Sequence, residues 1–113
     1  MKRGEIYLTN IKGTHGSVQT GLRPVIVVQN DVGNLHSPTT IVCSITSVRK
    51  KWLPTHLNIG TSGGLWKEST VLCEQIHTVA KADLKQYVGL ISDAHILKEL
   101  DRKILISLGI SED

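Results

Sequence analysis

Arg23 is the side chain whose type and setting are best suited to chemistry. It follows a stretch with three glycines at residues 10–21, and Pro24 then leads into four consecutive apolar residues at 25–28. A guanidinium held at the start of a buried strand can donate two parallel hydrogen bonds to a phosphate. The setting therefore predicts an anion-binding arginine. Composition alone favours the alternative, an ordinary surface arginine beside a strand.

Two further stretches place polar groups on predicted strands. Thr46 and Ser47 offer hydroxyls at a strand end, where they can donate to a phosphate oxygen or a base edge. Glu74, Gln75 and His77 interrupt a segment that begins with three apolar residues. Because Glu and Gln are rarely buried unpaired, they mark either a site or the solvated face of an edge strand. Both interpretations remain open.

The sequence lacks the motifs of nucleotide and metal chemistry. It contains no GxGxxG, no Walker-type phosphate loop and no HExxH. Its five histidines have no metal-ligand spacing, and its acidic residues do not cluster as they do in two-metal nucleases. If the chain acts on a phosphodiester, we expect it to work with no metal and no other cofactor.

The elements that must position these residues are mostly strands. Apolar runs that alternate or are rich in β-branched residues predict strands at residues 5–8, 25–28, 40–46, 55–59, 69–76 and 88–91. Turn-forming residues predict a turn at 30–34, and a helical turn is expected at 82–86. So many short strands favour closure into a small β-barrel, which removes exposed edges.

The last segment has a helical period. Ser92 is a suitable N-cap, Asp93 favours the positive end of a helix dipole, and Gly109 is suited to end the helix. Apolar residues recur at helical spacing between them: Ile96, Leu97, Leu100, Ile104 and Leu108. The fold is therefore expected to be mainly β (α+β), with one C-terminal α-helix packed on the barrel.

Size and composition indicate one domain over residues 1–113. The net charge of +3 and the pI of about 9.0 permit a polyanionic partner without requiring one. Cys43 and Cys73 lie in apolar runs, which predicts buried free thiols. The N-terminal residues lack the apolar segment of a signal peptide, and no apolar run approaches the ~20 residues of a membrane span. A cytoplasmic protein without a membrane partner is expected.

Seven short segments, taken in order, resemble the MazF/PemK family of type II toxin–antitoxin ribonucleases, and most closely its Gram-positive MazF branch. They are KRGEIY at residues 2–7, GLRPV at 21–25, QNDVGN at 29–34, SPT at 37–39, ITS at 45–47, LPTH at 53–56 and EQI at 74–76. The resemblance covers roughly residues 2–80, and the C-terminal helix matches only in character.

The resemblance implies a compact SH3-like β-barrel with a C-terminal helix, acting as a homodimer. It implies a sequence-specific, metal-independent endoribonuclease, an mRNA interferase that cleaves single-stranded RNA and inhibits translation and growth. It also implies a cognate antitoxin protein that neutralises the toxin, covers the RNA site with a flexible acidic tail, and binds DNA together with it.

The resemblance also implies roles for particular residues. The arginine of the Arg-Pro motif is Arg23 and the threonine after the third strand is Thr46, and both stand at catalytic positions of the family. Gln75 matches a glutamine that contacts RNA, and Ser17 stands where some members have a histidine. The residues expected to bind RNA are Ser17, Gln19, Ser47, Trp52, Glu74, Gln75 and His77.

Three positions depart from the family pattern. Glu74 stands where one branch has a catalytic aspartate, but Leu72 replaces the arginine found two positions earlier in that branch. A catalytic role for Glu74 therefore does not transfer. The close branch usually has Glu where this chain has Val18, and Arg or Lys where it has His77. Base contacts are expected there, so the departures affect the recognised RNA sequence more than the reaction.

RNA is most readily cut without a metal when its own 2′-OH attacks the adjacent phosphorus and the 5′-oxygen leaves. Arg23 would stabilise the charge on the phosphate oxygens or protonate the leaving oxygen, and Thr46 would add a hydrogen bond. Arginine is a poor base because its pKa is too high. His77, Glu74 and His15 are the open alternatives for base or acid, and each also suits a purely structural role.

Trp52 is the candidate for stacking on an RNA base. Single-stranded RNA is read through unstacked bases, and Lys50 and Lys51 beside this tryptophan give the mixture of charge and aromatic surface found in such grooves. The alternative is that Trp52 rests on the barrel or on a dimer partner.

Three other functions compete with RNA cleavage. A barrel that binds nucleic acid or an antitoxin without cutting would be favoured by loss of Arg23 or Thr46, and both are present. A gyrase-targeting toxin of the CcdB type works through an aromatic-Gly-Ile end, whereas here Leu108 precedes Gly109 and Ile110. A plain structural β-domain would leave the Arg-Pro motif unexplained.

Overall fold

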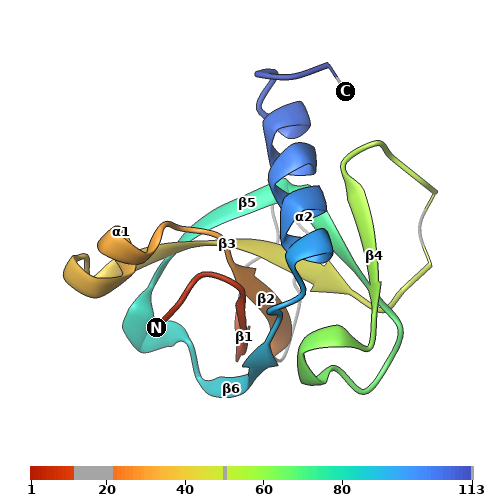
Figure 1. The fold of residues 1–113 in the computed structure, drawn as a ribbon. Coiled ribbons are helices and arrows are strands. Elements are labelled where there is room, and N and C mark those ends of the chain that lie inside the picture. Colours follow the sequence, from red (N-terminus) through yellow and green to blue (C-terminus); the bar gives the residue numbers. More distant parts are fainter. Residues whose placement is uncertain (12–21, 50, 113) are drawn as a thin grey trace.

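A six-stranded antiparallel sheet forms the body of the protein (Figure 1). The computed structural model describes residues 1–11, 22–49 and 51–112. The strand order is β4-β5-β3-β2-β1-β6. The strands are β1 (Glu5–Thr9), β2 (Arg23–Val27), β3 (Thr39–Thr46), β4 (His56–Gly60), β5 (Ser69–Ala80) and β6 (Gln86–Leu90). The sheet is curled into a half-barrel, and helix α2 (Ala94–Ser107) follows it, which confirms the expected mainly-β fold.

The two ends of the curled sheet meet through glycines. The 3-10 turn η1 (Ser62–Gly64) follows β4 and packs against β6, the strand at the opposite end of the sheet order. A Cβ atom at Gly89 would lie 2.1 Å from the carbonyl oxygen of Gly63, so only glycine permits this approach. The contact brings the sheet round on itself without a hydrogen-bonded β4–β6 ladder.

The main core lies between one face of the sheet and α2. Its buried members include Ile6, Ile26, Cys43, Val71, Cys73 and Leu100. A second cluster of Val25, Val27 and Val42 lies on the other face. Strand β2 is therefore buried on both faces, as its unbroken apolar run predicts. Cys43 and Cys73 are buried and free, as expected.

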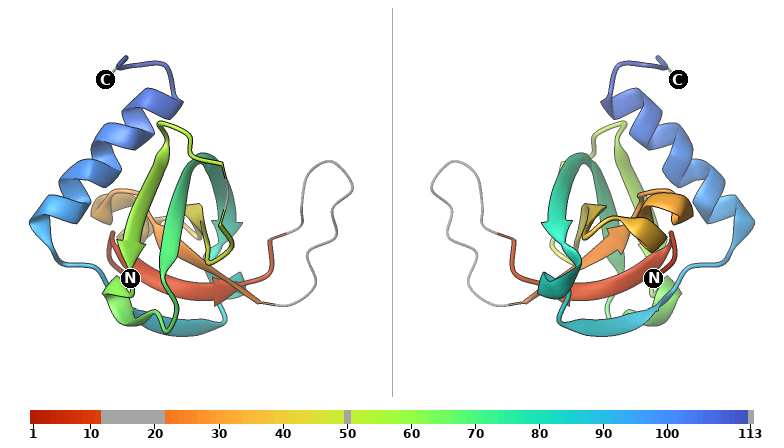
Figure 2. Two further views of the ribbon diagram at one scale, coloured as in Figure 1. Left: turned by 90° about the vertical axis from the view of Figure 1, so that its right-hand side faces the viewer. Right: turned by 90° about the vertical axis from the view of Figure 1, so that its left-hand side faces the viewer.

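Helix α2 lies along one side of the curled sheet (Figure 2). Its N-cap is Asp93, whose carboxylate accepts hydrogen bonds from the backbone of His95 and Ile96. The expectation of Ser92 as N-cap was wrong by one residue, because a carboxylate can accept both amides and also favours the helix dipole. Gly109, with a φ of 73°, follows the helix. Within the described segments no helix is both long and apolar enough to cross a membrane.

Strand β5 is longer than predicted and contains an irregularity. Its register with β3 moves from Ile76, opposite Cys43, to Leu72, opposite the next residue. Residues 73–75 are thus extra on β5 and form a bulge, which re-aims side chains. β5 lies between β4 and β3 in the sheet order, but its pairing with β4 ends at Leu72, so the edge-strand interpretation of Glu74 and Gln75 holds for this part of the strand.

Two local assignments also differ from expectation. Residues 31–36 form a short helix, α1 (Asp31–His36), where a turn was predicted. The side chain of Asn30 caps it by accepting a bond from Gly33, and Asn favours both turns and N-caps. The helical turn expected at 82–86 is the 3-10 turn η2 (Lys81–Asp83), and Gln86 already begins β6.

Candidate active site

A row of polar residues crosses the sheet on the face opposite α2. Residues directly opposite each other in antiparallel strands point to the same face. Thr46 at the end of β3 pairs with Thr70 of β5, and Thr70 pairs with Asn58 of β4. Thr70 donates a hydrogen bond of 2.8 Å to Asn58. The row therefore continues across three strands.

Arg23 extends this row onto β2. The β2–β3 pairing ends with Val25 opposite Ser44, and β2 begins two residues earlier while β3 ends two residues later. Arg23 and Thr46 thus each lie two residues beyond this pair, so by the alternation of strands both side chains point to the face of the polar row. Arg23 is exposed, so its guanidinium is accessible to a ligand.

The hydroxyl of Thr46 is oriented by the chain that follows it. Its Oγ1 accepts a hydrogen bond of 3.1 Å from the backbone amide of Val48. A hydroxyl that accepts one bond still carries a proton to donate. Thr46 therefore keeps a proton that it can donate to a ligand on the face it shares with Arg23.

Thr46 also lines a depression of about 230 Å³ at this end of the sheet. The floor carries residues of the polar row, and the rim comes from the connection between β3 and β4. The lining residues are Thr46, Val48, Arg49, Trp52, His56, Asn58, Thr70 and Leu72. The volume suits one small planar group, with a cation and several hydrogen-bonding groups around it.

Trp52 stands on the rim of this depression. Its side chain is 57% exposed, and its ring meets the ring of His56 edge-on at 6.1 Å between centroids. The ammonium of Lys103, from α2, lies 4.8 Å from the Trp52 ring centroid. The indole thus rests partly on the protein's own side chains and keeps a surface open to a ligand.

The bulge residues Glu74 and Gln75 differ in their surroundings. Glu74 accepts a hydrogen bond of 2.8 Å from the hydroxyl of Thr55, and its second oxygen lies 3.5 Å from Nε2 of His56. The carboxylate therefore ties the bulge to the start of β4. Gln75 is exposed at the bulge. Ser47 is also exposed, directly after Thr46.

His77 lies two positions beyond the bulge, on the same face as the polar row. It pairs with Val42, and its Nε2 lies 3.1 Å from the hydroxyl of Ser44. Ser44 is two residues from Thr46, or about 7 Å along the strand. Burial lowers the pKa of His77 below its ordinary value of 6.5, so the ring is neutral at pH 7.

This burial predicts a measurable pH dependence of stability. The unfolded chain binds a proton at His77 at higher pH than the folded chain does, so stability falls as the pH drops below about 6.5. We expect His77→Gln, which keeps a hydrogen-bonding tip near Ser44, to lose less stability than the wild type on acidification. Urea unfolding at pH 7.5 and 5.5 would measure this. Equal losses in both proteins would contradict the prediction.

Several predicted site residues cannot be placed against this geometry. Ser17 and Gln19, together with His15, Val18 and Lys50, lie outside the described residues. Of those that can be placed, Arg23 and Thr46 lie at the ends of adjoining strands, and Trp52 and Thr46 line the depression. Ser47, Glu74, Gln75 and His77 are not among the residues that line it.

Sequence reasoning missed Arg49, Asn58 and Thr70, which line the same depression. For Asn58 the signal was available, because it is the polar position between buried Leu57 and Ile59 in an alternating strand. Thr70 became visible only once its pairing with Thr46 was known. Arg49 lies in a connection whose path a sequence pattern does not specify.

A family model and a related protein of known name both show similarity to MazF-like proteins. Residues 2–108 match the family described as PemK-like, MazF-like toxin of type II toxin–antitoxin system. The chain is 45% identical over 112 residues to the endoribonuclease MazF of Staphylococcus saprophyticus, and the match covers 97% of this chain and 92% of that protein.

Solved structures share the fold. An endoribonuclease from a mycobacterial species, determined in complex with its cognate antitoxin, has a TM-score of 0.80 at 24% identity and covers 98% of this chain and 97% of its own. A MazE–MazF crystal structure from Deinococcus radiodurans has a TM-score of 0.75 at 21% identity, with coverage of 98% and 97%. At these identities the likeness concerns the fold alone. The family match and the relative at 45% identity go further, and the chain belongs to the PemK-like, MazF-like toxins of type II toxin–antitoxin systems.

Proposed function

We propose that this chain, as a single toxin domain, is a sequence-specific, metal-independent endoribonuclease that cleaves single-stranded mRNA. The observation that carries the proposal is the placement of Arg23 and Thr46 at adjoining strand ends on one face. An arginine fork and a hydroxyl donor side by side suit a phosphate that gains negative charge. The relative at 45% identity is named an endoribonuclease, which supports the same activity.

The reaction needs no metal, because RNA carries its own nucleophile. The 2′-oxygen forms a new bond to phosphorus and the bond to the 5′-oxygen breaks, which leaves a 2′,3′-cyclic phosphate and a 5′-hydroxyl. Arg23 and Thr46 hold the phosphate oxygens as charge builds on them. One proton leaves the 2′-oxygen and one reaches the departing 5′-oxygen.

The acceptor of the first proton is best sought at His77. Its neutral ring can accept a proton and lies on the face of the polar row, bonded to Ser44. Glu74 is already engaged by Thr55 and His56, which suits an anchoring role. Arg23 is the candidate donor toward the 5′-oxygen.

The depression beside Thr46 suits an unstacked RNA base. Trp52 offers an exposed aromatic surface for stacking, and Asn58 and Thr70 offer groups that hydrogen-bond to a base edge. Arg49 adds positive charge for a neighbouring phosphate. Further contacts are proposed for the remaining candidates, Ser17, Gln19, Ser47 and Gln75.

Partners follow from the family. We propose a cytoplasmic homodimer that is neutralised by a cognate antitoxin, as a type II toxin requires. The mycobacterial endoribonuclease was solved in complex with its cognate antitoxin, and the Deinococcus structure is of MazE–MazF. The net charge of +3 suits both an acidic antitoxin segment and RNA. Cleavage of mRNA would then inhibit translation and growth when the antitoxin is removed.

The direct test is cleavage of a long, unstructured RNA by purified protein in excess EDTA. Discrete cuts that survive chelation, together with loss of cutting at a site whose 5′-side nucleotide is 2′-deoxy, are expected. A folded protein that binds this RNA without cutting it would instead indicate a binding module. A folded protein that neither binds nor cuts RNA would favour a toxin that acts on a protein such as gyrase.

A further inference from the structure

Lys103 is a buried lysine that joins the C-terminal helix to the rim of the depression. Its side chain is only 6% exposed, whereas Lys98 on the same helix is exposed. The Nζ atom donates a hydrogen bond of 3.1 Å to the carbonyl oxygen of Pro54 and lies 4.8 Å from the ring centroid of Trp52. One ammonium thus contacts two residues of the β3–β4 connection.

Burying a lysine is costly unless its charge is well partnered. Here the contacting partners are a carbonyl and the face of an indole, and the full negative charge nearby, that of Glu99 one turn earlier on α2, is already paired with Arg102. This arrangement contributes less to stability than an apolar side chain of similar size could, because the ammonium loses its hydration. A role in holding the connection in one conformation accounts for the burial better than stability does.

His56, the first residue of β4, also contacts the β3–β4 connection. The backbone amide of Leu53 donates to Nδ1 of His56 at 3.3 Å, and the His56 ring meets Trp52 edge-on. His56 is in turn close to Glu74 of the β5 bulge. Trp52 therefore lies between a cation supplied by α2 and an imidazole supplied by β4, and its ring orientation is set by both.

We infer that Lys103 is a positioning residue for RNA binding: it holds Trp52 at the rim of the depression, ready to stack on a base. The inference rests on the proposed ribonuclease function and deepens it. Ordering an aromatic side chain before the ligand arrives removes an entropic cost from binding. Loss of Lys103 should therefore weaken substrate binding more than it slows the chemical step.

The test uses the full chain in a Trp66→Phe background, so that Trp52 is the single tryptophan. Lys103→Met keeps the length of the side chain and removes the charge and the donor. We expect it to make Trp52 more accessible to acrylamide, a neutral quencher, and to raise KM for RNA about tenfold with kcat changed less than about twofold. Lys103→Arg should restore both, and Lys98→Met is the matched control on the same helix.

Two readouts separate this inference from the proposed function. If the wild type does not cleave RNA, the proposed function fails, while quenching of Trp52 still shows whether Lys103 holds the indole. Unchanged quenching or an unchanged KM in folded Lys103→Met would overturn the inference, and so would a loss confined to kcat. If Lys103→Met fails to fold, Lys103→Gln is used for the same comparison. It keeps a polar tip and removes the charge.

Discussion

Replacing Arg23 with alanine is expected to lower the rate of RNA cleavage by about 10³-fold, the upper end for loss of one group that stabilises an oxyanion. Arg23 is the first residue of β2 and is exposed, so the change removes charge without opening the core. Single-turnover cleavage of an RNA with one identified site would measure the effect. Thermal unfolding should stay close to that of the wild type.

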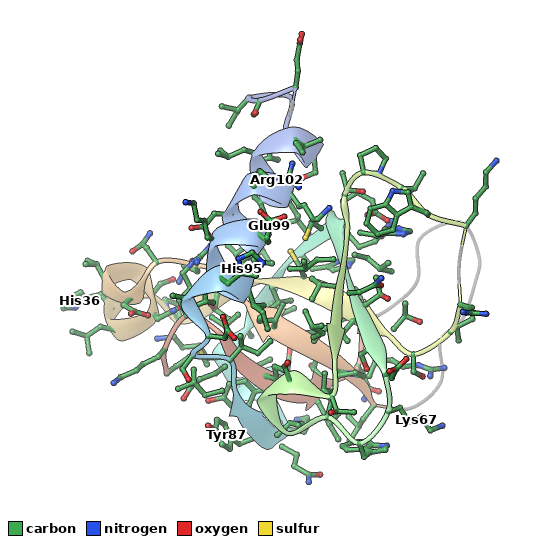
Figure 3. The ribbon with its side chains drawn as sticks, turned by 45° about the vertical axis from the view of Figure 1, so that its right-hand side comes forward. His36, Lys67, Tyr87, His95, Glu99 and Arg102 are labelled. Atoms are coloured by element: carbon green, nitrogen blue, oxygen red, sulfur yellow. The ribbon has the colours of Figure 1, made fainter. Side chains whose placement is uncertain are left out.

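Two further variants give this experiment its controls. Arg102→Gln removes a cation from α2, where Arg102 pairs with Glu99 (Figure 3), and it should leave cleavage unchanged. Arg23→Lys keeps the charge but loses the planar fork, so we expect activity between those of wild type and alanine variant. Near-normal cleavage by Arg23→Ala would remove Arg23 from the centre of the reaction and require another cation near Thr46.

Much of the fold could be predicted because its strands carry strong local signals. The four β-branched residues at 25–28 predict a strand buried on both faces, and β2 is buried in this way. Element boundaries were less predictable, because the residues that form turns also cap helices. Asn30 illustrates this: its side chain begins α1 where a turn was expected.

The bulge in β5 shows why the site was harder to predict than the fold. Polar residues at 74 and 75 have the appearance of an edge strand, and the pairing with β4 does end at Leu72, but the extra residues 73–75 also change which way each side chain points. Register is a tertiary property, so the alternation of a single strand does not reveal it. The row that joins Thr46, Thr70 and Asn58 depends on register in the same way.

Contacts between distant segments were beyond prediction for a similar reason. Lys103 and Pro54 are 49 residues apart, and no local pattern relates a helical lysine to a loop carbonyl.

The contacts of Glu74 give this residue a role even though the family's catalytic role does not transfer to it. Its carboxylate bonds to Thr55 and approaches His56, so the position has a structural use here that does not depend on catalysis.

Replacing Thr46 with valine is expected to slow cleavage by about 10²-fold, the lower end for loss of one oxyanion donor. Valine keeps the β-branched shape that suits the end of β3, so the strand and the depression should persist. The substitution also removes the Oγ1 atom that accepts a hydrogen bond from the Val48 amide. That hydrogen bond is exposed, so its loss alters stability little. The decisive quantity is kcat, because the hydroxyl is proposed to act on the charge of the transition state.

Thr46→Ser keeps the donor and should recover most of the rate, while Thr78→Val is the matched threonine control on an exposed position of β5. A valine variant that raised KM and left kcat unchanged would mean that Thr46 binds RNA without stabilising the reacting phosphate. Arg23 would then supply that stabilisation without Thr46. Combining Arg23→Ala and Thr46→Val in one protein therefore shows whether the two strand ends act as one catalytic unit. Residues that act as a unit give a combined loss of rate that is smaller than the product of the two single losses.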